Sequence, residues 1–236
     1  MPRVRMEFSK GDQVRFLSHL DMIKAFERAI RRAEIPIAFS EGFNPHPRMN
    51  FASAVAVGVT SEREYVDIEL RPGADTNDIV ERLAQALPPG ICVKRGQPVP
   101  DSTPALMAEV NRAVYKVIAA PKGPIDSGLL ETKLNDFMNR PEVVVTKRTK
   151  KGPRQKDIRP GIVGLQGTTE NSTVDFSIIT FTGSEGNIRP EEVVYAFTEW
   201  SGLPLDGDSL YIRRIALYIE KDGKLVSPMD IHMPLC

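Results

Sequence analysis

The sequence predicts an α+β protein made of two tandem ferredoxin-like halves, each with an antiparallel sheet. Apolar residues alternate along some segments and recur at helical spacing along others, and these segments follow in the order β-α-β-β-α-β twice. The stretch 98–104 adds a further observation, because its three prolines interrupt both helices and sheets. We therefore expect a linker there, between an N-terminal domain at 1–97 and a C-terminal domain at 105–236.

The first half opens with a strand at 4–8 and a helix at 18–34. Ser18 and Asp21 mark the helix start, because their side chains can bind the free amide groups of the first turn. Alternation of polar and apolar residues predicts a half-buried strand at 64–70. The other elements expected in this half are a strand at 36–39, an extended arm at 49–59, a helix at 75–87 and a strand at 91–95.

The second half repeats the order of elements, although no sequence repeat between the halves is apparent. Strands are expected at 112–119, 142–148, 174–182 and 209–220, with helices at 127–138 and 189–201. The tandem arrangement is thus predicted by the order of elements alone.

Residues 142–159 carry the strongest charge feature of the chain, and Gly152-Pro153 at their centre predicts a hairpin with a basic tip. Against Glu142 and Asp157, the segment holds seven cations: Lys147, Arg148, Lys150, Lys151, Arg154, Lys156 and Arg159. Each cation that meets a phosphate releases a condensed counterion, so the hairpin predicts nucleic-acid binding. RNA is favoured over DNA because no helix-turn-helix or zinc-finger signature is present. The alternative is a solvated hairpin whose charges protect an edge strand.

The loop at 41–48 predicts a second contact site. Two prolines hold the preceding residues, Asn44 and His46, in extended conformations, so the loop presents Asn44, His46 and Arg48 on a stiff backbone. We expect these side chains to line a cleft near Arg15 and His19 and to bind RNA there. His46 is a candidate general base, hydrogen-bond donor to a phosphate, or partner contact, and His19 is a second catalytic candidate. The alternative for His19 is local packing or capping at the helix start.

Several of these motifs carry a family resemblance. The runs 15–21, 41–47, 57–62, 147–152 and 157–160 resemble an uncharacterised bacterial family described as radical-SAM-linked. Its members are fused to, or encoded beside, a cobalamin-binding-type radical SAM protein. The resemblance implies a radical SAM protein as partner and carries no established reaction.

Composition and cysteine usage restrict the class of protein. An apolar content of 41% and a charged content of 26% are ordinary for a globular chain, and the formal net charge is zero. Cys92 and Cys236 are too few and too distant for a disulfide framework, a cysteine zinc site or an iron–sulfur cluster. We expect no metal and no cofactor. No apolar run approaches the roughly 20 residues that span a bilayer, and no signal peptide is recognisable, so we expect a cytoplasmic protein without membrane contact.

Together with the radical SAM partner that the resemblance implies, these observations predict an RNA-binding accessory protein that presents or docks substrate for a radical SAM RNA-modifying enzyme, without catalysis by this chain alone. One alternative is a stand-alone, metal-independent RNA-processing or RNA-modifying enzyme. Paired ferredoxin-like domains are similar in arrangement to CRISPR repeat-processing endonucleases and, more loosely, to pseudouridine synthases, although a shared fold does not establish function. The other alternative is a pure protein-interaction subunit.

Overall fold

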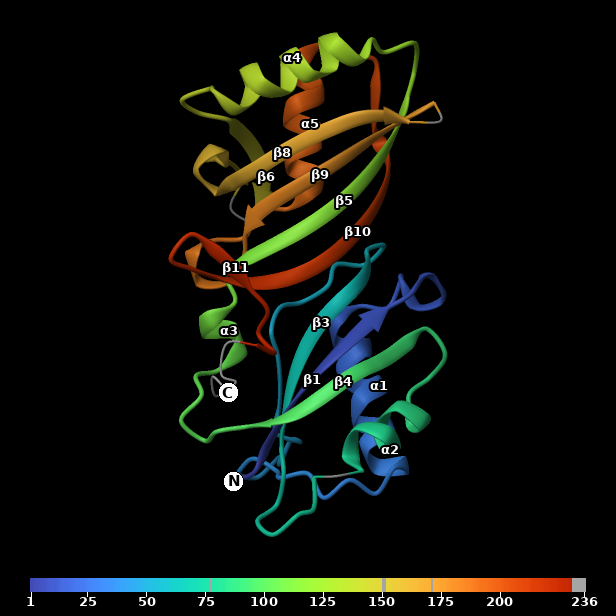
Figure 1. The fold of residues 1–236 in the computed structure, drawn as a ribbon, viewed down its shortest axis with the longest axis vertical. Helices are drawn as coiled ribbons and strands as arrows, with labels where there is room; N and C mark the ends of the chain where they lie inside the picture. The colour runs from blue at the N-terminus through green and yellow to red at the C-terminus, as the bar shows by residue number, and fades with distance from the viewer. Residues whose placement is uncertain (77, 150–151, 171, 231–236) are drawn as a thin grey trace. The chain divides into compact units, whose positions relative to one another are not determined.

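The computed structural model describes residues 1–76, 78–149, 152–170 and 172–230 (Figure 1). The chain divides into two compact units, which are described separately. Unit 1 comprises Met1–Asn111 with Arg214–Cys236, and unit 2 comprises Arg112–Arg213. Five α-helices and a large, mostly antiparallel sheet occur in the described part of the chain, so the predicted mixture of helices and antiparallel strands is confirmed.

In unit 1, β1 lies between β4 and β3, and β2 pairs with β3. The elements of this unit are β1 (Arg3–Lys10), α1 (His19–Arg32), β2 (Met49–Phe51), β3 (Thr60–Glu69), α2 (Ile79–Ala86), β4 (Ile91–Val99), α3 (Leu106–Glu109) and β11 (Lys224–Val226). In unit 2, β9 lies between β5 and β8. Its elements are β5 (Arg112–Pro121), α4 (Ser127–Met138), β6 (Val144–Thr149), β7 (Gly152–Asp157), β8 (Ile162–Glu170), β9 (Thr173–Phe181) and α5 (Pro190–Ser201). The strand β10 (Leu205–Lys221) belongs to both units.

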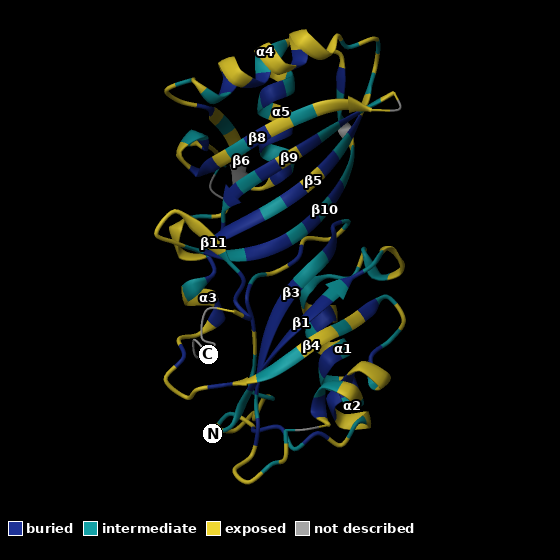
Figure 2. Ribbon diagram, viewed as in Figure 1, coloured by how far each residue is buried: buried dark blue, intermediate teal, exposed yellow. Residues whose placement is uncertain are grey.

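The core of unit 1 forms where β1 meets α1. Phe8 of β1 packs edge-on against Phe26 of α1 at a ring-centroid distance of 5.0 Å, and Phe51 of β2 contacts both rings. Figure 2 shows β1 buried along most of its length. The predicted helix start is confirmed, because Ser18 Oγ accepts a hydrogen bond from the Asp21 amide while the Asp21 carboxylate accepts one from the Ser18 amide. Local capping and a buried aromatic cluster therefore fix α1 on the sheet.

The core of unit 2 is also aromatic. Phe137 of α4 packs against Phe197 of α5 at 5.5 Å, and Phe197 contacts Phe176 of β9 at 5.8 Å. The predicted helix at 127–138 is confirmed with its bounds, and the Asp126 carboxylate caps it by accepting a hydrogen bond from the Leu129 amide. The helices α4 and α5 are thereby joined to the sheet through three phenylalanines.

Three predictions about the elements need correction. Residues 36–39 form no strand; Ile37 and Phe39 make only isolated bridges. The strand expected at 142–148 pairs with β7 in a separate two-stranded sheet rather than in the large sheet. The strand β8 pairs with β9 in its place. The sequence did not predict β8, because its glycines and threonines obscure the alternation of apolar and polar residues.

The proline-rich stretch 98–104 lies inside unit 1, where its first two residues end β4 and the others lead towards α3. The Arg3 guanidinium donates hydrogen bonds to the carbonyls of Pro100 and Thr103, and the N-terminal amine pairs with Asp101 at 3.0 Å. The division between the compact units falls instead at Arg112 and again within β10. Pro98 thus pairs with β1 as part of β4, and the segment after β4 is held by Arg3 of β1 in the same unit.

Candidate nucleic-acid interface

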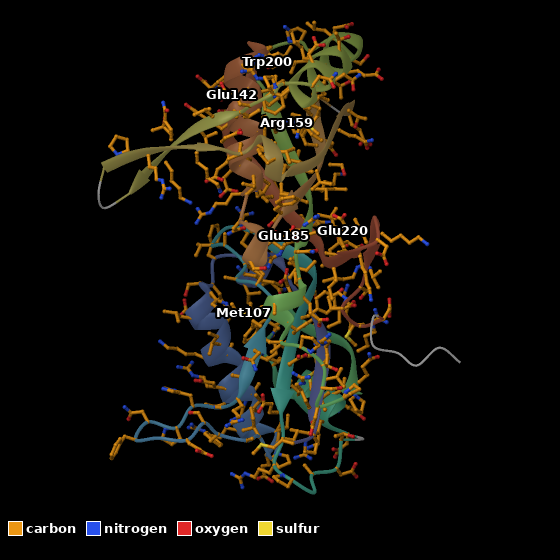
Figure 3. The ribbon with its side chains drawn as sticks, turned by 90° about the vertical axis from the view of Figure 1, so that its left-hand side faces the viewer. Met107, Glu142, Arg159, Glu185, Trp200 and Glu220 are labelled. Carbon is orange, nitrogen blue, oxygen red and sulfur yellow. The ribbon has the colours of Figure 1, made fainter. Side chains whose placement is uncertain are left out.

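The hairpin β6–β7 is the most distinct surface feature of unit 2. It forms a two-stranded sheet of its own, and Figure 3 shows it extending away from the rest of the unit. The register pairs Lys147 with Arg154 and Val145 with Lys156. Gly152 has a φ of +107°, a conformation that residues with a side chain rarely adopt, so glycine permits the chain to reverse there. The predicted hairpin in this basic segment is therefore confirmed.

Its cations differ in how far they are engaged by the protein. Arg154 is exposed, and Lys147 Nζ lies 3.9 Å from the Glu192 carboxylate of α5. Lys156 Nζ donates to the Asn187 carbonyl at 3.0 Å. Lys150 and Lys151 lie outside the described residues, and Arg148 is described only as part of the β6 backbone.

Arg159, predicted as an RNA contact, serves the fold. Its guanidinium donates to the Met138 carbonyl at 2.6 and 3.1 Å and to the Ile162 carbonyl at 2.9 Å. Met138 is the last residue of α4, so Arg159 satisfies a carbonyl that the helix end leaves free. These bonds occupy the guanidinium and tie α4 to the base of the hairpin.

Replacing Arg159 tests this structural role. We expect Arg159→Gln to lower the free energy of unfolding by roughly 2–3 kcal/mol, because hydrogen bonds from a charged donor are lost at partly buried carbonyls. The measurement is urea denaturation followed by circular dichroism. The control is Arg154→Gln on the exposed hairpin, for which we expect a change within about 0.5 kcal/mol. Equal losses in both variants would contradict the assignment.

A groove of about 870 Å³ opens between β6 and α5. Consecutive residues from Val143 to Lys147 form one wall, and Glu191, Tyr195 and Glu199 lie on α5 at successive helical turns along the other. Tyr195 is 54% exposed. The groove therefore combines an open aromatic ring with acidic and basic side chains, and its volume is within the range of small-molecule sites.

Trp200 lies at the end of α5 (Figure 3). It also lines the groove. Its ring lies 5.6 Å from that of Phe137, while Arg140 Cζ and Lys133 Nζ lie 5.5 and 5.4 Å from its centroid. Cations within about 6 Å of an indole are attracted by its negative face. Tyr195 and Trp200 are not among the residues predicted from the sequence; the i, i+4 spacing of Tyr195 between Glu191 and Glu199 is the signal that the sequence offers.

The loop predicted at 41–48 forms the turn of a short hairpin-like segment in unit 1. The Ser40 amide donates to the His46 carbonyl at 2.8 Å, and the His46 amide donates to Ser40 Oγ at 2.9 Å. Asn44 and His46 are exposed. His46 also lines a groove of about 550 Å³ with Glu27 and Arg31 from the second half of α1.

The other residues expected around this loop lie elsewhere in unit 1. Arg48 Nη1 pairs with the Glu69 carboxylate at 3.0 Å. Arg15 stacks over the Phe16 ring at 4.6 Å, at the opposite end of α1 from the groove that holds His46. His19 begins α1 and packs edge-on against Phe51 at 5.5 Å. The structure thus places His19 and His46 in different pockets rather than along one cleft.

His19 instead neighbours a buried lysine. Lys10 Nζ donates to the carbonyls of Leu17 and Ala56 at 3.0 and 3.2 Å. Lys10 and His19 both line a cavity of about 10 Å³. Burial lowers the pKa of His19, with the Arg214 charge acting in the same direction. The cavity has room for about one water molecule, so it offers no space for a nucleotide.

Burial lowers the pKa of Lys10 to about 8, partly opposed by the nearby Glu64 carboxylate. An unfolded lysine keeps its proton to a pH of about 10.4, so between pH 8 and that value the unfolded chain binds more protons and stability rises with pH. We expect a gain of roughly 1–2 kcal/mol from pH 7.5 to 9.5. A neutral amine retains the two hydrogens that both carbonyls need.

Thermal unfolding at pH 7.5, 8.5 and 9.5 measures this gain. We expect Lys10→Met to lose it, whereas Lys24→Met, at an exposed position of α1, retains it. A Lys10→Met variant with the pH profile of the unmodified protein would show that another group titrates in this window.

A buried ion pair that the sequence did not predict stands beside Lys10. Arg214 of β10 donates to both oxygens of Glu64 on β3 at 2.6 Å, and both side chains are almost fully buried. Ser61 Oγ donates a further hydrogen bond to Glu64, and Arg214 Nη1 donates to the Ala54 carbonyl at 3.2 Å. The pair joins residues 150 positions apart, a separation that no local pattern reveals.

In the described part of the chain, no group of three or more His, Cys, Asp or Glu side chains is placed to hold a metal ion. None of the described helices has the length and apolar character needed to span a membrane.

Comparisons with known proteins concern the family and the fold. Residues 3–190 match a family described as "Uncharacterized protein conserved in bacteria (DUF2344)". No curated protein matches the chain. A chain in the crystal structure of a Cbf5-Nop10-Gar1 complex is 10% identical with a TM-score of 0.51, over 98% of this chain and 53% of that one. A chain of the archaeal box H/ACA sRNP Nop10-Cbf5 complex is 8% identical with a TM-score of 0.47, over 90% of this chain and 46% of that one. The chain thus spans about half the length of these structures' chains, and at such identities the likeness concerns the fold alone.

Proposed function

The chain belongs to the DUF2344 family of uncharacterized bacterial proteins, and we propose that it is an RNA-binding accessory protein. Its role is to present or dock RNA for a radical SAM RNA-modifying enzyme. The RNA contact is made by the hairpin β6–β7, and the single observation that carries the proposal is the charge and isolation of that hairpin.

Residues 144–157 hold six cations and one carboxylate, in a chain whose formal net charge is zero. The carboxylate, Asp157, accepts hydrogen bonds from the amides of Val143 and Arg159, so backbone groups partly compensate it. Lys147 and Arg154 are paired across the two strands, which concentrates positive charge on the hairpin. Such a projecting basic ribbon suits a phosphate backbone, because each cation that meets a phosphate releases a counterion.

The fold and the partner complete the proposal. We propose that each unit is a ferredoxin-like half, because the order β-α-β-β-α-β recurs once β6–β7 is treated as an insertion. The radical SAM partner rests on the motif resemblance of residues 15–21 and 41–47. The fold is similar to that of a chain from a Cbf5-Nop10-Gar1 complex, a likeness compatible with an RNA-related role.

Removing two hairpin charges tests RNA binding. We expect Arg148→Gln with Arg154→Gln to weaken binding of a 20-nucleotide single-stranded RNA roughly 25-fold at 0.1 M salt. The slope of log K against log salt should fall by about 1.4, since each phosphate contact on a single strand contributes about 0.7. Fluorescence anisotropy over a series of salt concentrations measures both quantities.

The matched control removes two charges from another strand turn. Lys221 and Lys224 face each other across the β10–β11 turn and are exposed, so Lys221→Gln with Lys224→Gln alters a similar structure by the same charge. We expect its affinity and slope to stay near those of the unmodified protein. Equal losses in the two variants, or no binding of the RNA or of total tRNA by the unmodified protein, would overturn the RNA proposal. If this protein binds no RNA while a protein partner does, the alternative of a pure protein-interaction subunit would be favoured.

A further inference from the structure

The groove between β6 and α5 lies beside the basic hairpin, and the RNA proposal leaves it without a role. We propose that this groove takes an unpaired guanine of the bound RNA, stacked on Tyr195 and held by the Glu199 carboxylate. The inference rests on the proposed RNA-binding function and names the part of the RNA that unit 2 recognises.

An exposed aromatic ring provides the first argument. Tyr195 is 54% exposed although it lines the groove, so its side chain is accessible to a ligand bound there. Single-stranded RNA is commonly held by stacking of bases on such rings. Val144, which is 46% exposed on the opposite wall, adds an apolar surface for the other face of a base.

Charge provides the second argument. Glu191 lies 3.8 Å from Arg189, and Glu192 lies 3.9 Å from Lys147, so each of these carboxylates has a cation nearby. Glu199 is exposed one turn beyond Tyr195 on the same face of α5. An ionised carboxylate only accepts hydrogen bonds, and its two oxygens can accept from two adjacent donors.

Among the four RNA bases, the Watson–Crick edge of guanine alone offers adjacent N–H donors, at N1 and N2. Uracil flanks its single N–H with carbonyl oxygens, and adenine and cytosine place an acceptor nitrogen beside the amino group. A carboxylate beside a stacked base therefore favours guanine and repels the other edges. Lys147 lines the groove and pairs with Arg154 across the hairpin, so the groove adjoins the cations that would bind the phosphates.

An extended peptide is the competing occupant, because β6 pairs only with β7 among the described residues and an unpaired strand edge can accept another strand. A nucleic-acid base is favoured for two reasons. The hairpin that contains β6 is strongly cationic, and the exposed Tyr195 ring lies between the carboxylates of Glu191 and Glu199 on α5.

The test uses Trp200, the only tryptophan of the chain, which lines the groove and reports on it directly. The probes are two labelled RNA octamers, U8 and the same octamer with one central guanine. We expect the guanine octamer to bind about tenfold more tightly than U8 by anisotropy and to change Trp200 fluorescence, excited at wavelengths where RNA absorbs little. Glu199→Gln should abolish the preference while leaving U8 affinity unchanged, and Tyr195→Ala should abolish both the preference and the fluorescence change.

Glu131→Gln, at an exposed position of α4 outside the groove, is the matched control and should keep the guanine preference. Circular dichroism checks that the variants fold. Equal binding of the two octamers, with Trp200 unchanged and the hairpin variant still impaired, would overturn the guanine site and leave the RNA proposal intact. Binding of neither octamer nor tRNA would overturn both. A Trp200 response to a decapeptide of alternating valine and lysine, but to no RNA, would assign the groove to a protein strand and overturn the inference.

Discussion

Glu64→Gln is expected to lower the free energy of unfolding by about 3–5 kcal/mol, because it removes the negative member of a buried ion pair. The Arg214 guanidinium would then stay buried at 3% exposure, opposite a neutral amide. Two hydrogen bonds of 2.6 Å would lose their charged acceptor, and the hydroxyl of Ser61 would lose its carboxylate partner. Urea denaturation followed by circular dichroism measures the loss.

Two comparisons separate the charge from the packing. Glu69→Gln on the same strand disrupts a more exposed pair with Arg48 and should cost less than about 1 kcal/mol. Glu64→Met combined with Arg214→Met removes both charges and should be less damaging than Glu64→Gln, because the Arg214 charge is no longer buried without its carboxylate. If the double variant has a lower free energy of unfolding than Glu64→Gln, the pair contributes by holding β10 in place rather than through charge compensation.

Elements with a local cause could be predicted from the sequence. The start of α1 follows from Ser18 and Asp21, and α4 follows from the spacing of its apolar residues. The basic hairpin follows from Gly152-Pro153 between charged strands. In each case the determining interactions lie within a few residues, where periodicity and turn chemistry apply.

Elements that depend on distant partners could not be predicted. The strand β8 carries Gly164 and Gly167, and its alternation becomes clear only when it lies beside β9. The Gly167 position shows why a glycine is present: a Cβ atom there would lie 3.0 Å from a Leu134 methyl group and 3.1 Å from the Phe176 ring. Tertiary packing, rather than strand propensity, therefore explains this residue.

The candidate site shows the same limit. Residue type alone drew attention to the cations at 147–156, but it could not tell that Arg159 donates its hydrogen bonds to the carbonyls of Met138 and Ile162. It grouped His19 with His46 because both lie near motifs, whereas α1 separates their pockets. Tyr195 and Trp200 lacked any motif and became visible only through their shared groove.

The floor of that groove yields the second large effect. Phe137 is fully buried, lies 5.5 Å from Phe197 and 5.6 Å from Trp200, and joins α4 to α5. We expect Phe137→Ala to lower the free energy of unfolding by about 3–5 kcal/mol, since the substitution removes buried apolar surface and leaves a cavity. Trp200 should also emit at longer wavelength in the folded variant, because its ring loses an aromatic neighbour.

Denaturation followed by Trp200 fluorescence measures the stability loss within unit 2. Leu129→Ala, which shortens an exposed side chain of the same helix, should change stability by less than about 0.5 kcal/mol and leave the emission unchanged. A loss below 1 kcal/mol with unshifted emission would show that Phe137 does not hold the floor of the groove. The expected result would instead mean that Trp200 is positioned by the core of unit 2, so a fluorescence change on adding RNA reports occupancy of a formed groove.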